Sequence, residues 1–114
     1  MKRGDIYITK LSNSGSIQSG RRPVIIVQND IGNYFSPTTI VCCLTTKKRH
    51  KSYLPTHCFI GKNGGLIRNS TVLCEQIFTV NKNDLEEYIG TITNQGILKK
   101  LDRCVSMSLG LSEE

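Results

Sequence analysis

The order of its segments predicts a mainly β chain with appended helices, of the α+β class: an antiparallel barrel or sandwich with a helix packed on one side. Two observations support this prediction. Short segments rich in β-branched and apolar residues recur along most of the chain, and turn-forming residues rather than regular helices separate them. Only the segment after these, near the end of the sequence, has apolar residues at helical spacing. Strands joined without intervening helices are expected to pair antiparallel.

Six segments are expected to form strands. Pro23–Gln28 is an almost continuous apolar run, which predicts a strand buried on both faces. The longest segment is expected to bend or bulge near Glu75 and Gln76. The expected strands are Asp5–Lys10, Pro23–Gln28, Thr39–Leu44, Thr56–Ile60, Ser70–Val80 and, at an edge of the sheet, Tyr88–Ile92.

The connections between these strands differ in composition. Leu11–Arg22 is rich in Ser, Asn and Gly, and a long irregular connection in a small domain is typically functional or disordered. Asn29–Asn33 has turn chemistry, and Tyr34–Pro37 is expected to be a surface loop with two aromatic residues. The basic cluster Lys47–Lys51 predicts a solvated loop, and Lys62–Gly65 predicts a turn.

Helical structure is expected near the end of the sequence. Asn81 is an expected N-cap for a short helical turn over Lys82–Glu86. Either Thr93 or Asn94 caps a final helix, and Gly110 ends it. The apolar stripe of that helix consists of Ile97, Leu98, Leu101, Cys104 and Val105, continued by Ser108.

Length and composition limit the class of protein. The chain has 114 residues, which predicts one domain spanning residues 1–114. Aromatic residues make up 6% and Trp is absent, so the core is expected to consist of Ile, Val and Leu. The net charge of +6 indicates a polyanionic partner, most simply a nucleic acid, although a modest positive charge also serves solubility alone.

The five cysteines are expected to be free, buried thiols. Their number is odd, there is no Cys-x-x-Cys motif, and no secretory leader is recognisable, which argues against a disulfide framework or a zinc site. The sequence also has no apolar run of membrane-spanning length. We therefore expect a cytoplasmic protein with no membrane partner.

Familiar catalytic motifs are missing from the sequence. There is no nucleophile elbow, no phosphate-binding glycine loop and no His-Glu-x-x-His motif. The remaining candidate catalytic residues carry a positive charge or a hydroxyl group. Arg21 and Arg22 precede one apolar strand, and Thr45 and Thr46 follow another. An arginine fork binds a phosphodiester through two parallel hydrogen bonds, and a threonine hydroxyl can donate to the same group. The alternative is that these residues are exposed arginines and threonines with high β-propensity.

A series of short motifs resembles the MazF/PemK toxin family, and most of all its Gram-positive MazF type. The series covers nearly the whole chain in order, which makes it more specific than any one tripeptide. The motifs are Arg3-Gly4-Asp5-Ile6-Tyr7, Gly20-x-Arg22-Pro23-Val24, Gln28-Asn29-Asp30, Ile31-Gly32-Asn33, Ser36-Pro37-Thr38, Leu54-Pro55-Thr56-His57, Leu73-Cys74-Glu75-Gln76-Ile77 and Ser108-Leu109-Gly110-Leu111.

The resemblance implies a small SH3-like barrel that works as a homodimer. It also implies a ribosome-independent, sequence-specific endoribonuclease without metal or other cofactor, whose RNA groove is covered by a cognate MazE-like antitoxin. The family's catalytic arginine falls on Arg22 and its catalytic threonine on Thr45, with Thr46 as the neighbouring alternative. The implied reaction is internal transesterification by a ribose 2′-hydroxyl, with Arg22 stabilising the pentacoordinate oxyanion.

Two positions depart from the family pattern. Many relatives have Gly-Ser-Glu-Gln in the first loop, and a catalytic role is assigned to that Glu in some of them. Here the loop contains Gly15-Ser16-Ile17-Gln18, and Ile17 cannot transfer a proton. Either the carboxylate is dispensable in this branch or another group replaces it. Phe78 stands where a basic residue is common, so we expect one phosphate contact to be lost.

Further RNA contacts are expected from polar and aromatic side chains, because single-stranded RNA is bound by stacking and by polar groups on unpaired bases. Tyr34 and Phe35 either stack on bases or pack on the barrel or a dimer partner. His57 is expected to be packed or hydrogen-bonded within its strand. The candidate RNA contacts are Gln18, Ser19, Arg21, Gln28, Tyr34, Phe35, Thr46, Lys47, Lys48 and Gln76.

Two other functions are compatible with this fold and charge. One is a nucleic-acid-binding module without catalysis, which would leave bound RNA intact. The other is a gyrase-directed toxin with the same barrel; that group typically has an aromatic C-terminus, whereas this sequence has Ser112, Glu113 and Glu114 there. The pairing of Arg22 with Thr45 favours the endoribonuclease.

Overall fold

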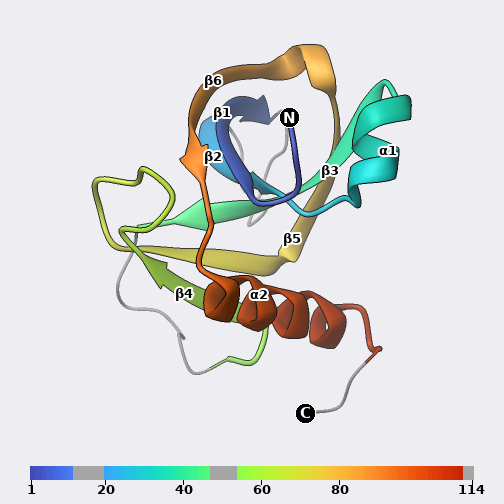
Figure 1. Ribbon diagram of the computed structural model, residues 1–114. Helices are drawn as coiled ribbons and strands as arrows, with labels where there is room; N and C mark the ends of the chain where they lie inside the picture. Colours follow the sequence, from blue (N-terminus) through green and yellow to red (C-terminus); the bar gives the residue numbers. More distant parts are fainter. Residues whose placement is uncertain (12–19, 47–53, 112–114) are drawn as a thin grey trace.

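One six-stranded antiparallel sheet forms the centre of the protein, in the strand order β4-β5-β3-β2-β1-β6. The computed structural model describes residues 1–11, 20–46 and 54–111 (Figure 1). The strands are β1 (Asp5–Leu11), β2 (Gly20–Ile26), β3 (Thr38–Thr45), β4 (His57–Gly61), β5 (Ser70–Asn81) and β6 (Leu85–Thr91). The helices are α1 (Asp30–Phe35), the 3₁₀ turn η1 (Lys82–Asp84) and α2 (Gln95–Ser108). The predicted α+β class with a C-terminal helix is confirmed.

The sheet is strongly curled, in the manner of a small barrel (Figure 1). The turn that follows β4 lies against β6, the strand at the opposite edge of the sheet. A Cβ added to Gly90 of β6 would overlap the backbone of Gly64, and a Cβ on Gly65 would come within 2.5 Å of the carbonyl oxygen of Ile89. This close backbone approach requires glycine and brings the two edges of the sheet together.

Strand alternation divides the apolar side chains between two clusters, one on each face of the sheet. Figure 1 shows α2 lying along β4 and β5, and the first cluster fills the space between helix and sheet. It includes Ile25, Cys42 and Leu44 from the sheet and Leu101 and Cys104 from α2. The second cluster, on the opposite face, consists of Leu11, Val24, Ile26, Val41 and Cys43. Residues 24–26 of the central strand β2 are thus buried on both faces, as predicted for this run, whereas Pro23, Val27 and Gln28 are only partly buried.

Several local predictions are confirmed. Cys42 of β3 pairs with Ile77 while Cys43 pairs with Leu73, so β5 has a bulge over the residues between them. Asn94 is the N-cap of α2, and its side chain accepts a hydrogen bond from the Ile97 N–H. Gly110 follows the helix with φ 75°. All five cysteines are free and buried, and no helix in the described part of the chain is long and apolar enough to cross a membrane.

The start of β2 differs from the prediction. Leu11–Arg22 was expected to be irregular, yet the strand begins at Gly20 and already ends at Ile26. The reason is pairing with β1: Thr9 pairs with Arg22, Lys10 with Arg21 and Leu11 with Gly20. Hydrogen bonds to a neighbouring strand override the low strand propensity of this stretch. Both arginines are therefore held by the sheet rather than by a loop.

The segment before β3 is a helix rather than the predicted turn and surface loop. Asn29 caps α1, since its side-chain oxygen accepts from the Gly32 N–H at 2.8 Å. The Ser36 N–H donates to the Gly32 carbonyl at 2.8 Å and closes the last turn. Pro37 follows, and proline does not continue a helix. The turn-forming residues thus act as a helix cap.

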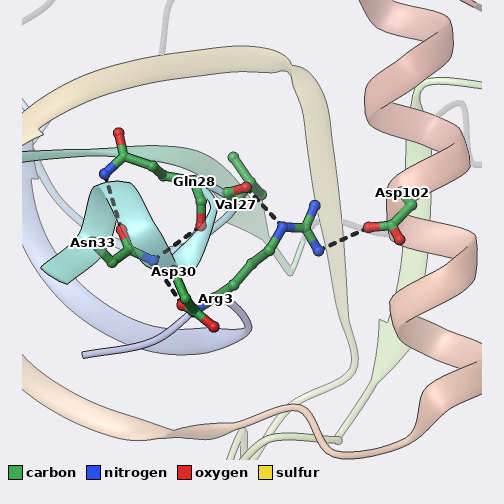
Figure 2. A network of polar contacts seen from close by, with 6 residues as sticks. All are labelled: Arg3, Val27, Gln28, Asp30, Asn33 and Asp102. Carbon is green, nitrogen blue, oxygen red and sulfur yellow. Dashed lines mark hydrogen bonds and ion pairs between the residues drawn. The ribbon is translucent and has the colours of Figure 1, made fainter.

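A buried amide holds α1 on the sheet (Figure 2). Asn33 is 4% exposed. Its Nδ2 donates to the Gln28 carbonyl at 2.9 Å and to Asp30 Oδ1 at 3.0 Å. Its Oδ1 accepts from Gln28 Nε2 at 3.1 Å and from Thr39 Oγ1 at 2.7 Å. Every polar atom of the Asn33 side chain is therefore paired.

Arg3 extends this network to the C-terminal helix (Figure 2). Its backbone N–H donates to Asp30 Oδ1 at 2.7 Å, and its Nε donates to the Val27 carbonyl at 2.8 Å. Its guanidinium also forms an ion pair of 2.8 Å with Asp102 of α2. Several of the motif residues in this sequence thus have an architectural role: they fasten the N-terminus, α1 and α2 to one end of the sheet.

Candidate active site

Arg22 and Thr45 come together through the pairing of β2 with β3. Val24 pairs with Cys43, Ile25 with Cys42 and Ile26 with Val41. If this register is continued by two residues, Arg22 lies opposite Thr45. Opposed residues of an antiparallel pair project from the same face, so the two side chains share one face at one end of the sheet. Both interact with neighbouring groups of the fold.

Two more threonines extend this pair into a row across four strands. Thr9 of β1 pairs with Arg22, and Thr71 of β5 pairs with Thr45. We call Thr9, Arg22, Thr45 and Thr71 the arginine–threonine row. Its three threonines are buried, and the Thr9 hydroxyl donates to the Asp84 carbonyl at 2.6 Å. The row therefore places one partly exposed guanidinium among hydroxyl groups fixed by the sheet.

The charge of Arg22 acts on the thiol of Cys43. Burial, and then the neighbouring Cys42, raise the pKa of Cys43 to about 12, and Arg22 opposes this shift. Cys43 is accordingly a neutral thiol at physiological pH and serves neither as a base nor as a thiolate nucleophile.

Arg21 differs from Arg22 in its partner. Its Nε donates to Glu86 Oε1 at 2.9 Å, with side chains 59% and 43% exposed. Successive residues of a strand point to opposite faces, so Arg21 does not share a face with Thr45. The two arginines therefore have different environments, and only Arg22 belongs to the row.

Two other predicted contacts lie near the row. Thr46 is exposed and directly follows β3. Gln76 lies in the bulge of β5, opposite Cys42 and Cys43, where it is partly buried and interacts with its neighbours. The structure thus brings both close to the end of β3 or to the strand beside it.

Gln28, Tyr34 and Phe35 lie at the other end of the sheet. Gln28 Nε2 donates to the Thr38 carbonyl at 3.1 Å, and Thr38 begins the strand that Thr45 ends. The seven residue steps from Thr38 to Thr45 correspond to about 23 Å along an extended strand. Tyr34 and Phe35 are 79% and 77% exposed and pack edge to face, with ring centroids 4.7 Å apart. The row and these three residues are separate surfaces.

The remaining candidates, Gln18, Ser19, Lys47 and Lys48, lie outside the described residues, as does Ile17. His57 is packed as expected: its side chain is 8% exposed and its Nε2 lies 3.0 Å from Glu75 Oε2. Within the described ranges, no group of three or more His, Cys, Asp or Glu residues is arranged to hold a metal ion.

Sequence reasoning missed the two flanking threonines. Thr9 and Thr71 each stand in an ordinary strand pattern, and only strand pairing brings them beside Arg22 and Thr45. A hollow of about 340 Å³ next to the row was also missed; it is lined by Thr46, Lys62, Ile67, Arg68 and Asn69. Sequence spacing gives no signal for this hollow, because Thr46 follows β3 whereas the other four residues lie in the connection between β4 and β5.

A basic antiparallel barrel that presents an arginine among fixed hydroxyls is suited to binding phosphodiesters. The sequence profile described as the PemK-like, MazF-like toxin of type II toxin–antitoxin system matches residues 2–109. The chain belongs to this family.

Individual relatives resemble the chain over nearly its full length. Endoribonuclease EndoA of Bacillus subtilis is 44% identical over 113 residues, which are 97% of this chain and 96% of that protein. Endoribonuclease MazF of Staphylococcus saprophyticus is 42% identical and covers 97% and 92% of the two chains.

Solved structures agree with the fold. An endoribonuclease from a mycobacterial species, in complex with its cognate antitoxin, has a TM-score of 0.82 at 26% identity and covers 100% of this chain and 99% of its own. A second mycobacterial endoribonuclease has a TM-score of 0.80 at 25% identity, over 100% and 95% of the chains.

Proposed function

We propose that this protein is a sequence-specific, ribosome-independent endoribonuclease toxin that cleaves single-stranded RNA, including mRNA. The observation that supports this most directly is the pairing of β2 with β3, whose register, continued by two residues beyond Val24 and Cys43, would set Arg22 opposite Thr45. The two curated relatives described above are named endoribonucleases, and this chain covers almost all of their length.

The proposed reaction is an internal transesterification. The ribose 2′-hydroxyl loses its proton as its oxygen attacks the adjacent phosphorus, the bond from phosphorus to the 5′-oxygen breaks, and that oxygen takes up a proton, so no proton is gained or lost overall. The products are a 2′,3′-cyclic phosphate and a 5′-hydroxyl. The nucleophile and the leaving group both belong to the RNA, so the protein has to position the phosphate and stabilise charge.

Arg22 and Thr45 have distinct roles in this proposal. Negative charge grows on the non-bridging oxygens as the pentacoordinate phosphorane forms, and a guanidinium fork donates two parallel hydrogen bonds to such oxygens. Arg22 supplies this fork, and Thr45 donates its hydroxyl to the same phosphate. Both side chains come from paired strands, so their geometry is set before the substrate binds.

The proposal also includes the partners of the toxin. RNA is bound along the face of the sheet that carries the arginine–threonine row, with Thr46 and Gln76 as the described contacts nearest to it. A cognate MazE-like antitoxin covers this surface, as one of the similar solved structures is itself a complex with a cognate antitoxin. We further propose that the protein acts as a homodimer in the cytoplasm.

The test is cleavage of a long RNA in the presence of EDTA. We expect a few discrete cuts, each leaving a 2′,3′-cyclic phosphate and a 5′-hydroxyl. An oligonucleotide with a single 2′-deoxyribose at a mapped cleavage site should stay intact, because it lacks the attacking hydroxyl. RNA that binds but is never cut would indicate a non-catalytic binding module, and cleavage of the deoxy substrate would refute the transesterification.

A further inference from the structure

The hollow beside the arginine–threonine row lies at the end of the strands that carry Thr45 and Thr71. Thr45 pairs with Thr71, and Ser70, the first residue of β5, pairs with Gly61, the last residue of β4. Lys62 follows Gly61, and Arg68 precedes Ser70 by two residues. Arg68 is three residue steps from Thr71, a span of at most about 10 Å. The hollow is therefore next to the proposed site of cleavage.

Two exposed cations line this hollow. The ion pairs within the described ranges join Arg3 to Asp102, Arg21 to Glu86, and His57 to Glu75. Lys62 and Arg68 belong to none of these pairs, so no described carboxylate neutralises them. Together with the amide of Asn69 and the hydroxyl of Thr46, they form a polar hollow with a positive charge.

The segment that carries both cations is fastened at several points. Asn63 Nδ2 donates to the Ile60 carbonyl at 2.7 Å, and the Leu66 N–H donates to the Asn63 carbonyl at 3.3 Å. Ser70 Oγ donates to the Arg68 carbonyl at 3.0 Å. The adjacent Gly64–Gly65 turn lies against β6, as described above. The backbone beneath the two side chains is thus ordered without a ligand.

We propose that Lys62 and Arg68 form a second phosphate subsite, which binds an RNA phosphate next to the scissile one. The inference rests on the proposed endoribonuclease function and identifies where the substrate strand continues beyond Thr45. Arg68 matches a phosphate through two donors, and Lys62 adds a point charge. Such contacts fix the register of the strand without reading its sequence.

The experiment measures binding of an RNA oligonucleotide that contains a mapped cleavage site with a 2′-deoxyribose at the cut position. Each phosphate contact to single-stranded nucleic acid contributes about 0.7 to the slope of log affinity against log salt concentration. Arg68→Gln should lower the magnitude of this slope by about 0.7 and weaken binding at low salt by about tenfold, as expected for one charge-assisted contact. Lys62→Gln should act in the same direction.

Arg103→Gln is the matched control. Arg103 is an exposed arginine on α2, which packs on the opposite face of the sheet, and the substitution removes the same charge. Its salt slope should equal that of the unaltered protein. A second experiment replaces each RNA phosphate in turn by a neutral methylphosphonate, which should weaken binding to the unaltered protein. At one position beside the cut, the replacement should make the RNA affinities of the unaltered protein and of Arg68→Gln equal.

The outcomes separate this proposal from the one on which it rests. If Arg68→Gln and Lys62→Gln keep the slope of Arg103→Gln while the unaltered protein cleaves RNA, the subsite is refuted and the endoribonuclease stands. If the unaltered protein does not cleave any RNA, the endoribonuclease is refuted. If the two variants change only binding of an acidic antitoxin segment, the hollow belongs to that partner and the subsite is again refuted.

Discussion

Replacing the buried Asn33 by alanine tests the network that holds α1 on the sheet. The substitution removes the acceptor of the Thr39 hydroxyl, whose residue is 0% exposed and has no access to water. It also removes a donor to the Gln28 carbonyl and one acceptor of Gln28 Nε2. Gln28 is partly exposed and retains its bond to the Thr38 carbonyl, so Thr39 bears most of the cost.

The expected destabilisation follows from these partners. A buried polar group left without a partner costs about 1–3 kcal/mol, and the lost bonds of Gln28 add about 1 kcal/mol. Asn33→Ala should therefore lower the free energy of unfolding by about 2–4 kcal/mol. The total free energy of unfolding of a small domain is typically about 5–15 kcal/mol, so this loss is a large part of it.

Urea unfolding followed by circular dichroism at a fixed protein concentration measures this change, since the chain has no Trp. The control is Asn83→Ala in η1, where the exposed side chain is expected to contribute less than about 0.5 kcal/mol. Thr39→Val removes the hydroxyl that Asn33→Ala leaves unpaired. The double variant should accordingly cost about 1–2 kcal/mol less than the sum of the single variants. Equal losses for Asn33→Ala and Asn83→Ala, or strict additivity with Thr39→Val, would refute the reasoning.

Three further predictions concern charge and reactivity. The Arg3 backbone N–H, chief among several contacts, lowers the pKa of Asp30 from its usual 3.8. The contribution of Asp30 to stability is therefore complete above this usual value and is lost as the pH falls through the lowered pKa. Asp30→Asn should be less stable than the unaltered protein at pH 7, and the difference should vanish only in unfolding measured below the lowered pKa. Arg21→Gln removes a solvent-exposed ion pair, which should change the free energy of unfolding by less than about 1 kcal/mol. The same substitution should lower the rate of RNA cleavage far less than Arg22→Ala does. Equal losses of cleavage in the two variants would contradict the different environments of the two arginines. Burial raises the pKa of Cys43 to about 12 and all five thiols are buried, so an aromatic disulfide reagent should label the cysteines only after denaturant is added, and rapid labelling of the native protein would contradict this.

The strands could be predicted from the sequence because their β-branched runs are local signals. The final helix was equally clear, since its apolar stripe, the Asn94 cap and Gly110 agree with one another. The helix α1 was missed because Asn29 and Gly32 are typical of turns as well as of caps. The choice between a turn and a helix depends on hydrogen bonds to the Asn33 side chain, one of which comes from Thr39 of β3.

For the candidate site, the sequence identified two residues but not the strand pairing that brings them together. Arg22 and Thr45 were identified from the motif resemblance, but their opposition depends on a register between β2 and β3 that no local pattern encodes. The different partners of Arg21 and Arg22 depend on pairing with β1. Lys62 and Arg68 could not be found at all, because the hollow exists only once β4 pairs with β5 and the turn after β4 lies against β6.

The central claim is that Arg22 and Thr45 act together on the scissile phosphate. Its most direct test is the single-turnover rate of cleavage of one mapped RNA site, in EDTA, by the unaltered protein and by Arg22→Ala and Thr45→Val. Removing one donor that stabilises a developing oxyanion costs roughly a hundredfold to a thousandfold. We predict losses of at least this size in both variants, with the circular dichroism spectrum and RNA binding retained. Cleavage by both variants within tenfold of the unaltered rate would contradict the account.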